Sequence, residues 1–138
     1  MKAREIFITQ RDKERLDELI GVVSEFGDRM RKDLAALRQE LDRAKVVAPR
    51  DIHRGVVTMN SRVELEDLDQ GETMVITLVF PLNAHPEGGA ISVLAPVGTA
   101  ILGYAEGDVV EWPVPDGMRR LRIRRIVYQP EAAGHFDL

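Results

Sequence analysis

Two acidic residues, Glu25 and Asp28, have an acid-x-x-acid spacing. Carboxylates held close to a divalent cation can help to activate water for hydrolysis. Both residues also have ordinary structural explanations. Asp28 stands at the predicted start of a helix, where aspartate caps free amides, and Glu25 adjoins the turn at Gly27. We favour the structural explanation, and we predict no catalytic residue and no bound metal ion.

Other residue types that often carry chemistry are not arranged for it. Three histidines lie far apart and lack neighbours at the spacing of zinc ligands: His53, His85 and His135. Ser61 and Ser92 lack the G-x-S-x-G context of a nucleophile elbow. Gly88-Gly89 is not followed by the Lys-Ser/Thr of a phosphate loop. The chain has no cysteine, which excludes disulfides and thiolate metal sites. We therefore predict that it is not an enzyme and binds no cofactor.

Five arginines gather near the C-terminus, at positions 119, 120, 122, 124 and 125. On a strand, Arg120, Arg122 and Arg124 would share one face. That face could be solvated and paired with glutamates of other strands, namely Glu64, Glu66 and Glu111. It could instead bind an acidic partner or a phosphate backbone. Residues 47–138 hold 8 Lys and Arg against 13 Asp and Glu, so we favour the solvated face and expect only incidental contact with DNA.

Helical periodicity dominates the first third of the chain. Thr9 is a predicted N-cap, with Asp12 three residues later as in a capping box, and the helical pattern runs from Gln10 to Val23. In the next segment the apolar residues alternate spacings of four and three, as in a coiled-coil seam: Met30, Leu34, Leu37, Leu41 and Ala44. A second helix of about 17 residues, roughly 25 Å long, would end before Pro49.

These two segments predict an antiparallel helical hairpin over residues 1–48. We expect it to have a core separate from that of the domain over residues 49–138. At 138 residues and 44% hydrophobic content, the chain fits one domain, or one domain with an appendage.

Period-two alternation and turn residues predict five strands in the second part. They cover residues 56–65, 74–80, 90–94, 108–112 and 118–128. A short helix opens at Pro96 and closes at Gly103. In the last strand Leu121 and Ile123 are out of phase with Ile126 and Tyr128. All four can face one core only if a bulge inserts a residue near Arg124 or Arg125.

Three segments carry a resemblance to a known family. They are Val-Val-Thr-Met-Asn-Ser-Arg-Val at 56–63, Ile-Ser-Val-Leu-Ala-Pro-Val-Gly-Thr-Ala-Ile-Leu-Gly at 91–103, and Tyr-Gln-Pro-Glu-Ala-Ala-Gly at 128–134. They resemble the Gre transcript-cleavage factors of the GreA/GreB family, and more closely its Rnk branch, the regulators of nucleoside diphosphate kinase. The resemblance implies an α+β fold, in which the hairpin precedes an FKBP-like antiparallel sheet that holds one short helix.

The resemblance also implies a partner. In Gre factors the domain after the coil docks on the rim of the RNA polymerase secondary channel, through the loop that enters the short helix. Here that loop is Leu94-Ala95-Pro96-Val97. The Gre pattern has Ser before this Pro and a basic residue after the helix-ending Gly, whereas this chain has Ala95 and Tyr104, and Rnk-like sequences share the Ala-Pro-Val-Gly form.

In Gre factors two acidic residues at the tip of a long coil help to hold the magnesium ion that activates water for RNA cleavage. Glu25 and Asp28 take the corresponding place here, as candidate partner contacts. The predicted helices are shorter than the Gre pattern. We therefore expect the tip to fall short of the catalytic magnesium.

The sequence thus predicts a transcription regulator that binds RNA polymerase without cleaving transcripts. It would compete with Gre factors and act indirectly on the level of nucleoside diphosphate kinase. Two alternatives are an FKBP-like peptidyl-prolyl isomerase, which the few unclustered aromatic residues disfavour, and a nucleic-acid-binding module. The start of the chain has no apolar run of signal length, so we expect a cytoplasmic protein without a membrane partner. We also expect it to be a monomer.

Overall fold

The computed structural model describes residues 5–23, 31–114 and 117–138. Its helices and strands are, in order, β1 (Phe7–Thr9), α1 (Gln10–Val23), α2 (Arg31–Arg43), β2 (Lys45–Val47), β3 (Arg62–Asp67), β4 (Thr73–Val79), β5 (Ala90–Ser92), α3 (Pro96–Ile101), β6 (Val109–Val114) and β7 (Gly117–Tyr128). Short 3-10 turns lie at Pro49–Asp51, Pro81–Asn83 and Pro86–Gly88. No helix in these described ranges has the length and apolar character needed to cross a membrane.

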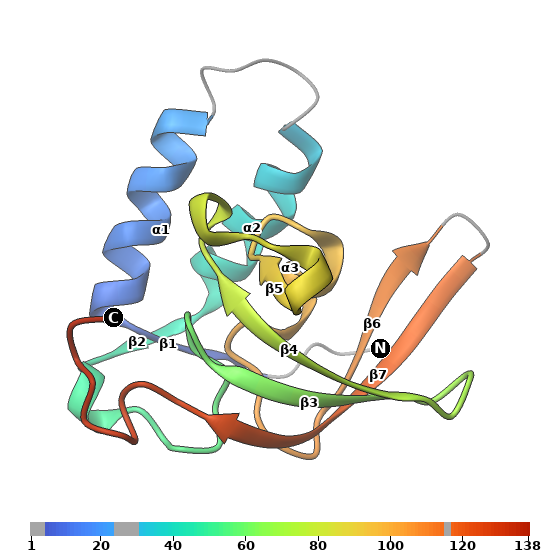
Figure 1. Ribbon diagram of the computed structural model, residues 1–138. Coiled ribbons are helices and arrows are strands. Elements are labelled where there is room, and N and C mark those ends of the chain that lie inside the picture. The colour runs from blue at the N-terminus through green and yellow to red at the C-terminus, as the bar shows by residue number, and fades with distance from the viewer. Residues whose placement is uncertain (1–4, 24–30, 115–116) are drawn as a thin grey trace.

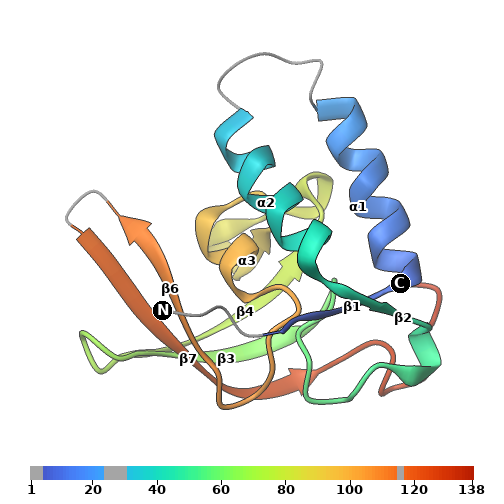
Figure 2. The same ribbon diagram turned by 180° about the vertical axis from the view of Figure 1, so that it is seen from behind.

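The two long helices stand side by side on one side of a twisted sheet, as Figures 1 and 2 show from opposite directions. The predicted start of α1 is confirmed, since the Asp12 amide donates a hydrogen bond of 3.0 Å to the Thr9 hydroxyl. Leu34, Leu37 and Leu41 of α2 are buried, as their spacing predicted. Met30 lies outside the described residues.

A pair of short parallel strands closes the base of the hairpin. β1 and β2 join Phe7 to Lys45, Ile8 to Val46 and Thr9 to Val47. The second helix, predicted to end before Pro49, ends at Arg43, because residues 45–47 pair with β1 instead of adding a helical turn. This pairing brings the two ends of the hairpin to one place at the sheet domain.

The main sheet has five strands in the order β5-β4-β3-β7-β6. The predicted antiparallel arrangement is confirmed for β3 with β4, β3 with β7, and β6 with β7. It is wrong for β5, which runs parallel to β4. The reason lies in residues 80–89, which form two 3-10 turns and carry the chain back to the same end of the sheet.

The predicted bulge in the last strand is confirmed. Glu64 pairs with Arg125 and Leu65 with Ile123, so Arg124 is the extra residue. The insertion brings Ile126 into line with the buried Leu121 and Ile123. The expectation that Tyr128 joins them is wrong, because a second register shift pairs Tyr128 with the exposed Arg62.

The first predicted strand is wrong in its first half, because β3 begins only at Arg62. Residues 58–61 form a turn in which the Ser61 amide donates to the Thr58 carbonyl, and Asn60 has a φ of 68°. Val57 instead exchanges hydrogen bonds with Gly103 and Tyr104. The side chains of residues 56–59 are all buried, because this segment is enclosed between the hairpin and the sheet.

The described part of the chain shares one hydrophobic core. Leu16 and Leu37 of the hairpin belong to the same cluster of buried side chains as Val63 and Leu65 of β3 and Ile101 of α3. The expectation of separate cores is therefore wrong, because the inner face of the hairpin packs on the sheet domain. The mixed α+β class predicted from the sequence is confirmed.

We predict that Leu37→Ala destabilises the whole chain. Leu37 has no exposed surface, and truncating a buried leucine to alanine costs about 2–5 kcal/mol. Hydrogen exchange should show protection falling together in α1 and in β3. Loss confined to the hairpin, with β3 as protected as in the wild type, would show that the two parts unfold independently.

Candidate functional site

The loop from β5 into α3 contains the residues predicted to contact a partner. Pro96 is exposed, and Ala95 and Val97 are partly exposed. Leu94 is only 6% exposed and belongs to the core, so its side chain anchors the loop from within. A contact made by this loop must therefore come from the other three residues.

Internal hydrogen bonds hold this loop in one shape. The Leu94 amide donates to the Ser92 hydroxyl at 3.0 Å, and the Thr99 hydroxyl donates to the Val93 carbonyl at 2.7 Å. Gly98 packs so tightly that a Cβ there would lie 2.3 Å from the Ser92 carbonyl oxygen, so only glycine fits. Pro96, which has no amide hydrogen, occupies the first turn of α3, where that donor is not needed. The loop thus presents Pro96 on a rigid support.

The other predicted contact residues, Glu25 and Asp28, lie outside the described residues. The histidines do not come together: His53 bonds with the Gly55 amide and His135 with the Tyr128 hydroxyl. Within the described ranges, no group of three His, Asp or Glu side chains is placed to hold a metal ion.

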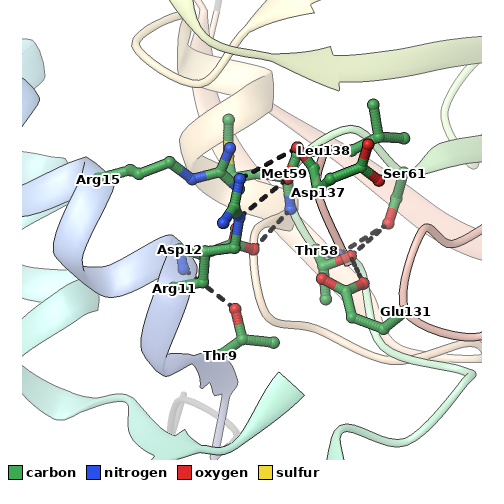
Figure 3. Close-up of polar contacts among 10 residues, drawn as sticks. All are labelled: Thr9, Arg11, Asp12, Arg15, Thr58, Met59, Ser61, Glu131, Asp137 and Leu138. Carbon is green, nitrogen blue, oxygen red and sulfur yellow. Dashed lines mark hydrogen bonds and ion pairs between the residues drawn. The ribbon is translucent and has the colours of Figure 1, made fainter. Parts of the chain in front are cut away.

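A buried carboxylate joins the hairpin to the sheet domain. Asp12 of α1 is 1% exposed, and its Oδ2 accepts a hydrogen bond of 3.0 Å from the Met59 amide (Figure 3). Its Oδ1 lies 2.6 Å from Nη2 of Arg15, one turn further along the helix. The predicted capping box is therefore only half right, because the Asp12 side chain reaches another segment instead of its own N-cap. The Arg15 guanidinium in turn lies 4.8 Å from the centre of the Phe80 ring.

A second polar cluster ties the C-terminal segment to the same turn. The Thr58 hydroxyl lies 2.7 Å from Oε1 of Glu131 and 2.9 Å from the Ser61 hydroxyl, which also accepts from the Thr58 amide (Figure 3). The buried Gln129 side chain donates to the carbonyls of His53 and Val56, both at 2.8 Å. The segments at 56–63 and 128–134 are thus bonded to each other.

The last residues also reach the hairpin directly. Arg11 donates to the carbonyl oxygens of Asp137 and Leu138, at 3.0 and 3.3 Å (Figure 3). These contacts are exposed, so we expect them to contribute little to stability. The base of α1 therefore contacts both the turn at 58–61 and the C-terminal segment.

Burial governs the ionisation of this junction. It is the largest influence on Asp12 and raises the pKa of that carboxyl above its ordinary value of 3.8, although the Met59 amide and Arg15 act in the opposite direction. Burial, together with the charge of Asp12, likewise raises the pKa of Glu131, against the effect of Thr58. The Asp12–Arg15 pair thus offsets only part of the cost of burying the charge. We infer that Asp12 serves mainly to satisfy the Met59 amide and to fix the position of the hairpin.

The arginine-rich strand β7 is paired with acidic side chains. Arg119 contacts Asp67 at 2.8 Å, and the remaining pairs are more exposed: Arg120 with Asp69, Arg122 with Glu66, and Arg124 and Arg125 with Glu64. The predicted partners Glu64 and Glu66 are confirmed, whereas no pair with Glu111 is found among the described residues. This arrangement supports a solvated sheet face with its charges compensated.

Sequence reasoning missed the two carboxylates of the junction. Asp12 was assigned to a capping box, and Glu131 appeared only within the segment at 128–134 that carries the family resemblance. One signal for Asp12 was available. With Leu16 and Ile20 as the buried stripe, a residue four positions before Leu16 lies on the same inward face.

We predict that Asp12→Ala lowers the free energy of unfolding by about 2–3 kcal/mol, because it leaves the buried Met59 amide without an acceptor. Asp12→Asn should cost less than half as much, since its amide oxygen can still accept that hydrogen bond. Urea unfolding at neutral pH measures both values. An Asp12→Ala protein within 0.5 kcal/mol of the wild type (below roughly the net value of one hydrogen bond) would contradict this role.

Glu131 gives a prediction for pH dependence. Because its folded-state pKa is raised, the folded protein binds the proton more tightly than the unfolded chain, and stability falls as pH rises from below 4.5 through the raised pKa. Glu131→Gln keeps an acceptor for Thr58 and removes this titration. The variant should therefore gain stability relative to the wild type between pH 4 and pH 7 (a range that brackets an unperturbed glutamate, about 4.3). A constant difference between the two unfolding curves would contradict it.

The chain matches two family models. Residues 52–128 match the C-terminal domain of the GreA/GreB transcription elongation factors, and residues 4–47 match the Rnk N-terminus. The first match spans β3 to β7, including the loop at Pro96. The second spans the hairpin and its β1–β2 base.

Individual relatives agree with these matches. The chain is 41% identical, over 96% of both chains, to the "Regulator of nucleoside diphosphate kinase" of Escherichia coli (strain K12). It is 34% identical to the "Transcription elongation factor GreA" of Alkaliphilus oremlandii, over 80% of this chain and 67% of that protein. Among solved structures, a "Prokaryotic transcription elongation factor GreA/GreB from Nitrosomonas europaea" superimposes with a TM-score of 0.73 at 41% identity, covering 91% of this chain and all of that one. The chain therefore belongs to the GreA/GreB family of transcription elongation factors, as a member with an N-terminal part of the Rnk type.

Proposed function

We propose that this protein is a transcription regulator that binds RNA polymerase at the rim of the secondary channel and does not cleave transcripts. Its docking residues are Ala95, Pro96 and Val97, on the support that the buried Leu94 provides. The observation that carries the proposal is that the match to the GreA/GreB C-terminal domain, at 52–128, includes this whole loop. Competition with Gre factors follows from a shared docking site.

The rigidity of the loop supports this assignment. Binding costs free energy whenever a flexible segment must be ordered, and a preformed loop avoids that cost. Ser92, Thr99 and Gly98 fix the loop from the inside, so the exposed ring of Pro96 is presented without rearrangement. A small apolar contact on a fixed support is suited to a shallow protein surface.

The length of the hairpin supports the absence of cleavage. α1 has 14 residues and is therefore about 21 Å long. The GreA relative from Alkaliphilus oremlandii is matched over 67% of its length, so a third of it lies outside the match. We propose that Glu25 and Asp28, which stand between α1 and α2 in the sequence and outside the described residues, do not reach the catalytic magnesium of the polymerase.

The Rnk-type relative suggests the biological output. Its name describes a regulator of nucleoside diphosphate kinase. We propose that this chain affects the level of that enzyme indirectly, through transcription.

The FKBP-like character of the sheet remains a proposal. An isomerase activity has little support, because the similar proteins are named as regulators or transcription factors. A nucleic-acid-binding module has equally little support, because the arginines of β7 are paired with carboxylates.

We predict that Pro96→Asp weakens binding to core RNA polymerase at least tenfold, because it places a charge in an apolar contact. Leu82→Asp is the matched control, since Leu82 is a fully exposed apolar residue of another loop. Binding of labelled protein, followed by fluorescence anisotropy, measures both. Equal affinity of Pro96→Asp and the wild type, with both shown to be folded, would refute the docking assignment.

Transcript cleavage gives a second, independent test. Backtracked elongation complexes incubated with the protein should release no short RNA above background, whereas a GreA protein in parallel should release it. Cleavage that disappears in the Glu25→Ala, Asp28→Ala double variant would show that the hairpin tip reaches the active centre after all.

A further inference from the structure

A cavity at the base of the hairpin has no part in the proposed docking. It has a volume of about 680 Å³ and opens between the β1–β2 pair and the loops near residues 51–56 and 103–108. Small-molecule sites in proteins have volumes of this order and are mostly apolar. The docking loop at Pro96 and the junction at Asp12 take no part in its lining.

Most of the cavity wall is apolar. Phe7 and Val47 contribute from the outer face of the β1–β2 pair, and Ile52 from the opposite loop. Ile52 is 9% exposed, while Phe7 and Val47 are partly buried. An apolar body placed here would gain free energy by leaving water.

The charged groups of the cavity all have one sign. Three carboxylates line it, from Glu5, Asp51 and Asp108, and the described lining residues include no lysine or arginine. The ring of His53, also in the wall, accepts a hydrogen bond of 2.9 Å from the Gly55 amide at Nδ1. Asp108 is 5% exposed and its Oδ2 already accepts a hydrogen bond of 2.9 Å from the Ala105 amide. It therefore adds negative charge to the wall, while the exposed Glu5 and Asp51 are the carboxylates open to a ligand.

We propose that this cavity binds a small organic cation, an ammonium group carried on an apolar body. The apolar wall would take the body, and the carboxylates would take the ammonium group. A phosphate-bearing or carboxylate ligand is disfavoured, because it would lose hydration and meet only like charge. This site does not depend on polymerase binding, so either proposal can fail without the other.

A series of three probes with the same ring tests the sign of the charge. Phenethylammonium, 2-phenylethanol and phenylacetate are titrated into the isotope-labelled full chain, and the amide resonances are followed by NMR. Phenethylammonium should give saturable shifts at residues 51–56 and 103–108, in the millimolar range expected for so small a ligand. Phenylethanol should bind at least threefold more weakly, and phenylacetate should give no saturable shifts there. Equal shifts from all three probes, or none from phenethylammonium, would overturn the proposal.

Variants connect the binding to the cavity. Asp51→Asn should raise the Kd of phenethylammonium about threefold, as expected for a partly exposed ion pair. Glu87→Gln removes the same charge from a residue outside the lining and should leave the Kd unchanged. Val47→Trp fills the cavity and should weaken binding at least tenfold, with its fold checked from the amide spectrum. Equal effects of Asp51→Asn and Glu87→Gln would show that only the overall charge matters, which would refute the site.

Discussion

The contact on which the rest of the arrangement depends is the hydrogen bond from the Met59 amide to the buried carboxylate of Asp12. The turn at 58–61 is enclosed, and a buried amide without an acceptor is costly. Asp12, which belongs to α1, supplies the acceptor. Burial raises the pKa of its carboxyl. Fixing the hairpin against the sheet domain in this way therefore carries the free-energy cost of burying the Asp12 charge.

The same junction gives a structural role to the three segments that carry the family resemblance. The turn at 56–61 and the segment at 128–134 meet there, joined by Gln129 and Glu131. The block at 91–103 builds the rigid support of Pro96 and ends at Gly103, which bonds with Val57. All three blocks therefore hold the loop at Pro96 and the hairpin in a fixed relation. A function carried by surfaces, as proposed for this chain, needs such a framework.

Local patterns in the sequence predicted much of the fold. The helical period placed α1 correctly, and the phase shift between Ile123 and Ile126 located the bulge at Arg124. Features that depend on distant partners were not predicted: the β1–β2 pair, the parallel β5 and the single core. Asp12 was missed for the same reason, since its acceptor role exists only once Met59 lies beside it. At the candidate site the position of the loop between a strand and the short helix was predicted, but the inward anchoring of Leu94 was not.

The shared docking site is the central claim, and displacement of a labelled GreA protein from core RNA polymerase tests it most directly. Increasing concentrations of this chain should displace the GreA protein completely, and excess GreA protein should reverse the effect, because both ligands need one site. Competing duplex DNA should not relieve the displacement, and its salt dependence should be shallow. A ternary complex in which both proteins remain bound to one polymerase would contradict the account.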